Sequence, residues 1–158
     1  MRRIGITGGI GSGKSVVSRL LRIMGYSVYD TDSEAKRLME SSLEVVQKLS
    51  ECFGRDIYHN GRLNRGLLSS RVFGESDKIV LLNSIVHPVV RFDFYRWSES
   101  LNEEICFVES AILYESRFDE LVDEVWTVTA PEELRIGRVR QRSGLTEEEI
   151  KKRMAAQL

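Results

Sequence analysis

The chain has 158 residues, of which 42% are apolar and 30% are charged, a composition typical of a single globular domain. The 23 basic and 24 acidic residues give a formal net charge of −1, which argues against a basic surface for nucleic acid. No apolar run reaches the roughly 18 residues of a membrane span, and the N-terminus lacks a signal-peptide core. Cys52 and Cys106 match neither a metal-binding spacing nor a disulfide framework, so we expect a cytoplasmic chain.

The first 32 residues predict the opening of a parallel α/β sheet. A short β-like segment at 3–7 is followed by a glycine-rich stretch. An apolar helix face comes next, at the spacing i, i+3, i+4 and i+7, formed by Val17, Leu20, Leu21 and Met24. Gly25 stands where the helix should end, and 27–29 is typical of a second strand. The order strand, loop, helix, strand favours a parallel sheet with covering helices.

Residues 33–104 predict helices almost throughout, which indicates a helical lobe inserted into the α/β core. The expected helical stretches are 33–53, with a break at Ser41-Ser42, then 64–73 and 77–85. A turn is expected at 59–61, and Pro88 suits the first turn of one more helix.

The core pattern returns at 105–108, where four consecutive apolar residues are typical of a buried parallel strand. Another strand is expected at 125–129, and Pro131 opens a helix that reaches about residue 142. Thr146 and Glu149 have the spacing of a capping box, which predicts a final helix running to the chain end. The predicted core therefore comprises 1–32 and 105–158.

The segment from Gly8 to Ser15, here called the phosphate loop, fits the pattern G-x-x-x-x-G-K-[ST]. Glycines let the backbone curl so that N–H groups point at phosphate oxygens, and the following helix N-terminus favours the same anion. Lys14 can reach the β- and γ-phosphates, and the Ser15 hydroxyl can ligate Mg²⁺. With a strand before it and a helix after it, the motif predicts a nucleoside-triphosphate site rather than a chance glycine-rich turn.

Acidic residues follow the predicted strands, at the edge where α/β sheets bind ligands. Asp30 and Asp32 follow the second strand, and a carboxylate there could orient or deprotonate an acceptor hydroxyl. The alternative is helix capping, because Thr31 and Glu34 have capping-box spacing. Glu109 ends the next strand and could hold the water shell of Mg²⁺, or be only a solvated strand end.

Basic residues give two further candidate groups. On the helix after Pro131 one face carries Arg135, Arg138 and Arg142. Arginines on a closing segment can neutralise charge on a transferred phosphoryl group, and Arg142, next to a Ser-Gly break, is the best placed; the alternative is a solvated basic face. His87 and Arg91 lie one helical turn apart and could grip a phosphate-bearing acceptor, or His87 could simply neighbour a helix start.

Taken in order, these motifs resemble those of the dephospho-coenzyme A kinase family. The stretch 4–15 is similar to the family's opening, Asp30-Thr31-Asp32 stands at its D-x-D, and 85–91 resembles its I-x-H-P-x-V-R. Arg138 and Arg142, followed by Leu145-Thr146 and Ala156-Gln157, resemble its lid and the helix behind the lid.

The resemblance implies a parallel-sheet P-loop fold of the nucleoside-monophosphate-kinase type. Residues 33–104 would be the acceptor-binding lobe and about 138–150 a short lid. The implied reaction is ATP-dependent phosphorylation, with Mg²⁺, of the 3′-hydroxyl of dephospho-coenzyme A, the last step of coenzyme A synthesis. The expected partner is that small molecule, with no nucleic acid or membrane, and the expected assembly is a monomer or weak homo-oligomer.

Motifs and resemblance together give the candidate site residues. The catalytic candidates are Asp32 as acid/base, Lys14 and Arg142. The ATP phosphates would be bound by Arg138 and by the loop residues Gly11, Ser12, Gly13, Lys14, Ser15 and Val16, with Ser15 on Mg²⁺. The acceptor would be bound by Asp32, His87, Arg91 and Glu109.

Two features depart from the family pattern. The segment 109–115 reads E-S-A-I-L-Y-E where the family usually has D-V-P-L-L-x-E, so Glu109 is one methylene longer than the usual acid. The family also continues past Gln157 with another strand and a closing helix, both of which we expect this chain to lack. A missing strand would leave an unprotected sheet edge.

Three other function classes can be compared. Shikimate-type kinases share the phosphate loop and a D-x-D, but they also need R-G-G and G-G-G segments that do not occur here. A GTP switch would need D-x-x-G and N-K-x-D, and neither string occurs. A catalytically impaired nucleotide-binding fragment stays as an alternative, because we expect the C-terminal strand of the family to be absent from this chain.

Overall fold

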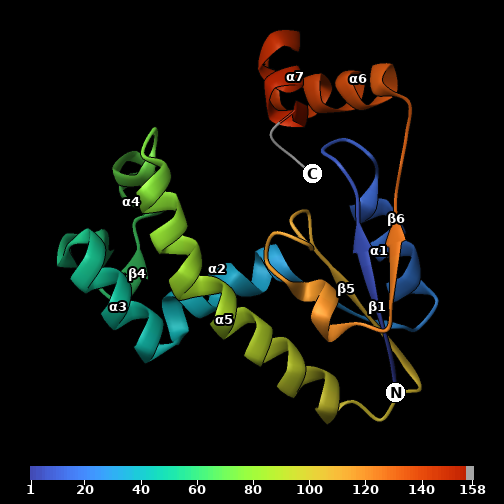
Figure 1. The fold of residues 1–158 in the computed structure, drawn as a ribbon, viewed down its shortest axis with the longest axis horizontal. Coiled ribbons are helices and arrows are strands. Elements are labelled where there is room, and N and C mark those ends of the chain that lie inside the picture. Colours follow the sequence, from blue (N-terminus) through green and yellow to red (C-terminus); the bar gives the residue numbers. More distant parts are fainter. Residues whose placement is uncertain (156–158) are drawn as a thin grey trace. The chain divides into compact units, whose positions relative to one another are not determined.

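The computed structural model describes residues 1–155, which divide into two compact units (Figure 1). The first, here called the sheet unit, comprises Met1–Asp30 together with the chain from Ser98 onward. The second, here called the helical unit, comprises Thr31–Trp97. No helix in the described part of the chain is long and apolar enough to cross a membrane.

A four-stranded parallel sheet forms the centre of the sheet unit, in the order β2-β5-β1-β6. Its strands are β1 (Arg2–Thr7), β2 (Ser27–Asp30), β5 (Ile105–Glu109) and β6 (Glu124–Thr127). The remaining elements of this unit are α1 (Lys14–Ile23), the 3₁₀ helix η2 (Phe118–Leu121), α6 (Glu132–Ser143) and α7 (Glu147–Ala155). The predicted α/β fold with a parallel sheet is confirmed.

The centre of this sheet is buried because its strands carry apolar residues, as the sequence predicts. The apolar run of β5 lies between β1 and β2, and its Cys106, Phe107 and Val108 are buried. One core cluster joins Phe107 to residues of β1 and α1, namely Ile4, Ile6 and Leu21. A strand with neighbours on both sides and apolar residues on both faces is typical of parallel sheets.

Helix α1 only partly matches the predicted apolar face. Leu21 is buried and Val17 packs against the core, but Leu20 and Met24 are 56% and 61% exposed. The contact with the sheet is thus a narrow stripe of positions four apart. The predicted helix end is confirmed, because Gly25 has a φ of 94° and its N–H donates to the Arg22 carbonyl at 3.1 Å, as in a glycine C-cap.

The helical unit contains mainly helices, as predicted. Its elements are α2 (Thr31–Ser41), α3 (Leu43–Phe53), the 3₁₀ helix η1 (Arg55–Ile57), β3 (Tyr58–His59), β4 (Arg62–Leu63), α4 (Arg65–Val72) and α5, which begins here and spans Ser76–Ser100. Ser42 separates α2 from α3, and its side chain accepts a hydrogen bond from the Val45 N–H at 3.5 Å, so the predicted break is confirmed. The predicted turn is the tip of the β3–β4 hairpin, where Asn60 and Gly61 both have positive φ.

The prediction of two helices on either side of Pro88 is wrong. Helix α5 runs from Ser76 to Ser100 without interruption, with Pro88 inside it. Proline removes a backbone hydrogen bond and usually breaks a helix. Here buried apolar side chains flank it on both sides, at Ile85, Val86, Val90 and Phe94. The burial of these side chains offsets the lost hydrogen bond. The sequence pattern does not indicate this burial, and only the tertiary packing shows it.

Helices α6 and α7 lie beyond the carboxyl ends of the sheet unit's strands, at the opposite end from the N-terminus (Figure 1). Gly144, in the left-handed conformation with φ 68°, ends α6. The capping box before α7 is confirmed: the Glu149 N–H donates to Thr146 Oγ1 at 3.3 Å, and Glu149 Oε2 accepts from the Thr146 N–H at 2.8 Å. Residues 156–158 lie outside the described residues. The predicted end of the last helix, and the Ala156-Gln157 pair that resembles the family pattern, fall in or reach into this segment.

Candidate active site

The phosphate loop connects β1 to α1, and its backbone requires glycine. Gly8, Gly11 and Gly13 have φ values of 146°, 77° and 108°, in the region that L side chains rarely adopt. A Cβ at Gly8 would lie 2.2 Å from the Val128 carbonyl oxygen. Gly13 is the residue before α1, and its carbonyl accepts from the Val16 N–H at 2.9 Å. The loop therefore has the curled form that the motif predicts.

Lys14 folds back over the phosphate loop. Its Nζ donates to the Gly8 carbonyl and lies 3.4 Å from the Gly9 carbonyl. The ammonium group is therefore placed at the loop rather than extended into solvent. Ser15 follows in the first turn of α1 with its side chain exposed, so its hydroxyl is accessible to a ligand. The Val16 side chain is 71% exposed, so any role in binding phosphate falls to its backbone.

Ser12 has a buried hydroxyl without a hydrogen-bond partner among the described residues. A Cβ at Gly8 would lie 2.9 Å from this oxygen, so the hydroxyl is packed closely against the start of the loop. An unpaired buried polar atom is costly, and a phosphate oxygen is the kind of group that would satisfy it. Ser12, the glycine backbone and Lys14 therefore form a cradle that fits an anionic phosphate.

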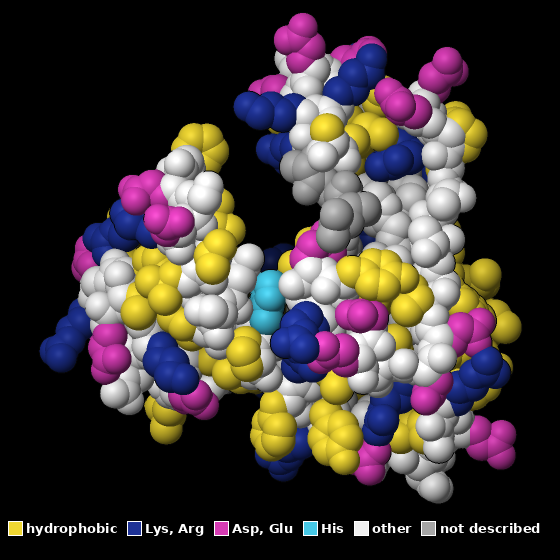
Figure 2. Space-filling view, in the orientation of Figure 1, with side chains coloured by type: hydrophobic (Ala, Val, Ile, Leu, Met, Phe, Trp, Pro, Cys, Tyr) yellow, Lys and Arg dark blue, Asp and Glu magenta, His cyan; other side chains and the backbone are white. Residues whose placement is uncertain are grey.

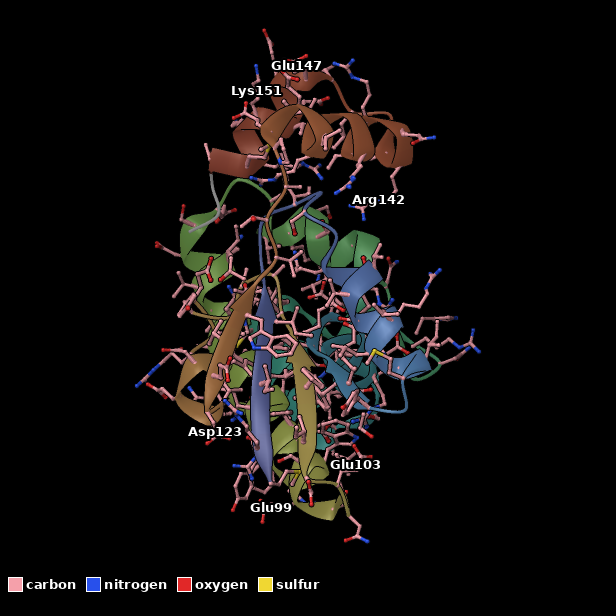
Figure 3. All side chains as sticks on the ribbon, turned by 90° about the vertical axis from the view of Figure 1, so that its right-hand side faces the viewer. Glu99, Glu103, Asp123, Arg142, Glu147 and Lys151 are labelled. Carbon is pink, nitrogen blue, oxygen red and sulfur yellow. The ribbon has the colours of Figure 1, made fainter. Side chains whose placement is uncertain are left out.

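Two arginines of α6 reach the phosphate loop. Arg138 Nη1 donates to the Gly11 carbonyl at 3.3 Å and the Ser12 carbonyl at 3.2 Å. Arg135 Nε donates to the Ile10 carbonyl at 3.0 Å. Arg135 was not among the predicted site residues, although its spacing from Arg138 placed both on one helix face. Arg142 lies on the side of α6 toward the sheet, whereas Glu147 and Lys151 of α7 point away from it (Figure 3).

Two acidic residues meet at the carboxyl edge of the sheet. The pairing of β2 with β5 places Asp30 directly opposite Glu109, and the pairing of β1 with β5 places Ile6 beside Glu109. Both carboxylates thus stand on neighbouring strand ends, at the end of β1 from which the phosphate loop starts. No group of three or more His, Cys, Asp and Glu side chains suited to a metal ion occurs within residues 1–155.

The acids at the opposite end of the sheet hold strand ends in place. The Glu103 carboxylate accepts from the Ser27 N–H at 3.2 Å, and that of Asp123 accepts from the Arg3 N–H at 2.7 Å. Glu99 forms an ion pair with Arg3. Figure 3 shows these three acids at the amino ends of the strands. Their role is structural, and no sequence pattern separates them from surface acids.

Three predicted site residues belong to the helical unit. Asp32 lies in the first turn of α2, which begins at Thr31. His87 and Arg91 lie one turn apart on α5, and both are half-buried. Burial lowers the pKa of His87, which favours the neutral imidazole. His87 is therefore suited to hydrogen bonding, and the fixed positive charge of the pair comes from Arg91.

Acidification should destabilise the protein through His87. Its pKa is lower in the folded chain than in the unfolded one, so the unfolded state binds the proton more readily. We expect the stability contribution to be complete above about pH 6.5, the ordinary histidine value, and to fall as the pH decreases below it. Thermal unfolding between pH 7.5 and pH 5.5 should show a smaller loss of Tm in His87→Gln than in the wild type.

The other histidine provides the control for this experiment. His59 is exposed on the β3–β4 hairpin, so His59→Gln should keep the wild-type dependence on pH. Equal pH dependence in His87→Gln and the wild type would contradict the assignment of the effect to His87.

Charged side chains of both signs are interspersed over the face of the molecule shown in Figure 2, without one large basic patch. The thiol of Cys106 is buried, and burial raises its pKa, so it is an unreactive thiol. Neither the surface seen in this view nor this thiol therefore adds a further candidate site to the residues described above.

The sequence also matches known proteins along its whole length. The dephospho-CoA kinase family model matches residues 2–158. The dephospho-CoA kinase of Porphyromonas gingivalis is 46% identical over 157 residues, which cover 99% of this chain and 78% of that protein. That of Corynebacterium diphtheriae is 40% identical over 162 residues, covering 100% of this chain and 81% of that protein.

Solved structures show that the fold is a known one. The crystal structure of TT1252 from Thermus thermophilus superposes with a TM-score of 0.85 at 38% identity, covering 99% of this chain and 80% of that one. The shikimate kinase of Acinetobacter baumannii, at 16% identity and a TM-score of 0.54, covering 99% of this chain and 73% of that one, shares the fold alone. The family match and the 46% identity separate the two kinase classes that share this fold. The chain belongs to the dephospho-CoA kinase family.

Proposed function

We propose that this chain transfers the γ-phosphoryl group of ATP to the 3′-hydroxyl of dephospho-coenzyme A, which gives coenzyme A. The observation that carries the proposal is the glycine-built phosphate loop, with the Lys14 ammonium on its Gly8 and Gly9 carbonyls, in a chain of this family. The loop supports a nucleoside triphosphate as donor, and the family supports the acceptor.

The residues of the phosphate loop fit the phosphates of ATP. The positive φ values of its glycines, the unpartnered Ser12 hydroxyl and the Lys14 ammonium together make an anion cradle. Mg²⁺, when bound with ATP, neutralises charge between the phosphate oxygens. The exposed Ser15 hydroxyl is the proposed protein ligand for that ion, and Glu109, at the end of β5, is proposed to hold its water shell.

Positioning and charge stabilisation supply most of the acceleration in phosphoryl transfer. In this proposal, Lys14 holds the γ-phosphate and neutralises charge that develops on it. Arg138, held on the Gly11 and Ser12 carbonyls, adds positive charge beside the loop, and Arg142, on the side of α6 toward the sheet, is proposed to neutralise charge on the transferred group. Asp32 orients the acceptor hydroxyl and accepts its proton as the oxygen bonds to the γ-phosphorus, while the bond from that phosphorus to the β–γ bridging oxygen breaks and ADP leaves.

The helical unit is the proposed acceptor-binding lobe. Arg91 offers a fixed positive charge and His87 a neutral imidazole one turn away on α5, a pair suited to an anionic, phosphate-bearing acceptor. The proposed lid, about residues 138–150, contains the end of α6, the Gly144 turn and the start of α7.

Product formation tests the proposal. The chain is incubated with ATP, Mg²⁺ and dephospho-coenzyme A, and mass detection should show one phosphate added to the acceptor. Shikimate in place of dephospho-coenzyme A should give no phosphorylated product. ATP binding without any product would favour a nucleotide-binding fragment.

A chimera separates the two causes of a negative result. It is this chain extended at its C-terminus with sequence of the P. gingivalis relative, of which this chain covers 78%. Activity gained in the chimera would show that the added segment is needed for catalysis. Continued absence of product, with ATP still bound, would contradict the assigned acceptor.

A further inference from the structure

Helix α6 contacts the phosphate loop through the side chain of Arg135. The Nε–H donates to the Ile10 carbonyl at 3.0 Å, and the guanidinium lies over Gly9 so closely that a Cβ there would be 2.2 Å from Nη2. Arg135 is half-buried, unlike the exposed Arg138 and Arg140 of the same helix. The contact is therefore a packed one at the centre of the loop.

Backbone and apolar contacts also hold the phosphate loop against α6. A Cβ at Gly11 would lie 2.6 Å from the Arg135 carbonyl oxygen and 3.0 Å from Val139 Cγ2, so only glycine permits this approach. The Ile10 side chain packs against a buried cluster that joins α6 to α7, formed by Ile136, Val139 and Ile150. Arg135 thus acts where the loop and α6 already touch.

The hydrogen bonds to this loop determine which way its peptide groups face. In a trans peptide the carbonyl and the following N–H point in opposite directions. Arg135 draws the Ile10 carbonyl toward α6, so the Gly11 N–H faces away from the helix. Arg138 likewise binds the Ser12 carbonyl on the side of α6, so the Gly13 N–H faces away from the helix. With the Ile10 and Ser12 carbonyls directed at α6, the Gly11 and Gly13 N–H groups point to the other side of their peptides and can donate to an anion there.

We propose that Arg135 is a positioning residue for ATP: it fixes the Ile10–Gly11 peptide so that its N–H faces the phosphates. It acts through the loop and does not touch the acceptor. The inference rests on the proposed function only in taking ATP as the nucleotide. Loss of the Nε–H should therefore weaken ATP binding and leave the affinity for dephospho-coenzyme A unchanged.

Two neutral substitutions separate the hydrogen bond from the charge. In Arg135→Gln the amide nitrogen stands the same number of bonds from Cα as Nε, so it can still donate to the Ile10 carbonyl. Arg135→Met has similar length and no donor. By calorimetry with ATP and Mg²⁺ we expect Met to raise the Kd about tenfold, the scale of one charge-assisted hydrogen bond, and Gln to raise it less than about threefold.

A third arginine of α6 supplies the matched control. Arg140 is exposed and forms an ion pair with Glu147 at 3.1 Å, so Arg140→Met removes the same charge from the same helix without touching the loop. Its Kd for ATP should stay within about twofold of the wild type, since exposed ion pairs contribute little. The KM for dephospho-coenzyme A should be unchanged in all three variants.

Each other outcome has a defined meaning. Equal weakening in the Gln and Met variants would assign the effect to charge and overturn the proposal, as would equal weakening in Arg140→Met or none in Arg135→Met. A wild-type chain that binds ATP but forms no coenzyme A would overturn the proposed function alone, because the binding series still measures the role of Arg135. A wild-type chain that binds no ATP would overturn both.

Discussion

Replacing Lys14 with alanine is expected to reduce the rate of coenzyme A formation about 10²- to 10³-fold. The Lys14 Nζ already lies at the carbonyls of Gly8 and Gly9, so its charge is placed at the phosphate loop before the substrate arrives. Preorganised charge of this kind costs no rearrangement during the reaction, and removing one such donor from an active site has an effect of about this size. Steady-state kinetics with mass detection of the product measure the loss.

A lysine in the helical unit is the matched control for Lys14. Lys48 is exposed and pairs with Glu44 within α3, an ion pair of small energetic value. Lys48→Ala should keep the rate within about twofold of the wild type. Circular dichroism should show that Lys14→Ala remains folded. A folded Lys14→Ala enzyme with nearly wild-type turnover would mean that the phosphate loop does not hold the reacting phosphate.

Replacing Asp32 with asparagine is expected to reduce turnover about 10²- to 10⁴-fold, the range for loss of a general base, while ATP affinity stays close to that of the wild type. Asparagine preserves the shape of the side chain but cannot accept the hydroxyl proton. Separate measurement of kcat and of the Kd for ATP distinguishes this result from a general loss of binding.

The competing interpretation is that Asp32 only stabilises the start of α2, where it is an acid in the first turn. Asp77 occupies the same kind of position in α5 and has no proposed chemical role. Asp77→Asn therefore measures the effect of losing an acid from a helix start. If Asp32→Asn and Asp77→Asn both cost only about 0.3–1 kcal/mol of stability and leave turnover unchanged, Asp32 is a helix-stabilising residue alone.

The local features of this fold could be predicted because their causes are local. Gly25 ends α1, Ser42 separates α2 from α3, and the Thr146–Glu149 capping box begins α7, each through hydrogen bonds between residues close in sequence. The phosphate loop is local in the same sense. Glycine at positions 8, 11 and 13 permits the positive φ that the loop adopts, and Lys14 follows directly at the start of α1.

Errors arose where burial decided the outcome. The apolar spacing of α1 predicted that Leu20 and Met24 would be buried, but a pattern cannot indicate how wide the contact with the sheet is. The helix-breaking tendency of Pro88 predicted two helices, but apolar packing on both sides of it maintains one. In both cases, neighbours distant in sequence outweighed the local preference.

The sequence by itself determined the family, the phosphate loop and the alternation of strands and helices, because these depend on residue type and short-range spacing. The tertiary structure alone decided the strand order β2-β5-β1-β6, which sets Asp30 opposite Glu109. It also decided that Arg135 contacts the Ile10 carbonyl across 125 residues of chain. Spacing along a helix shows which arginines share a face, but only the packing of that helix against the loop shows what the face meets.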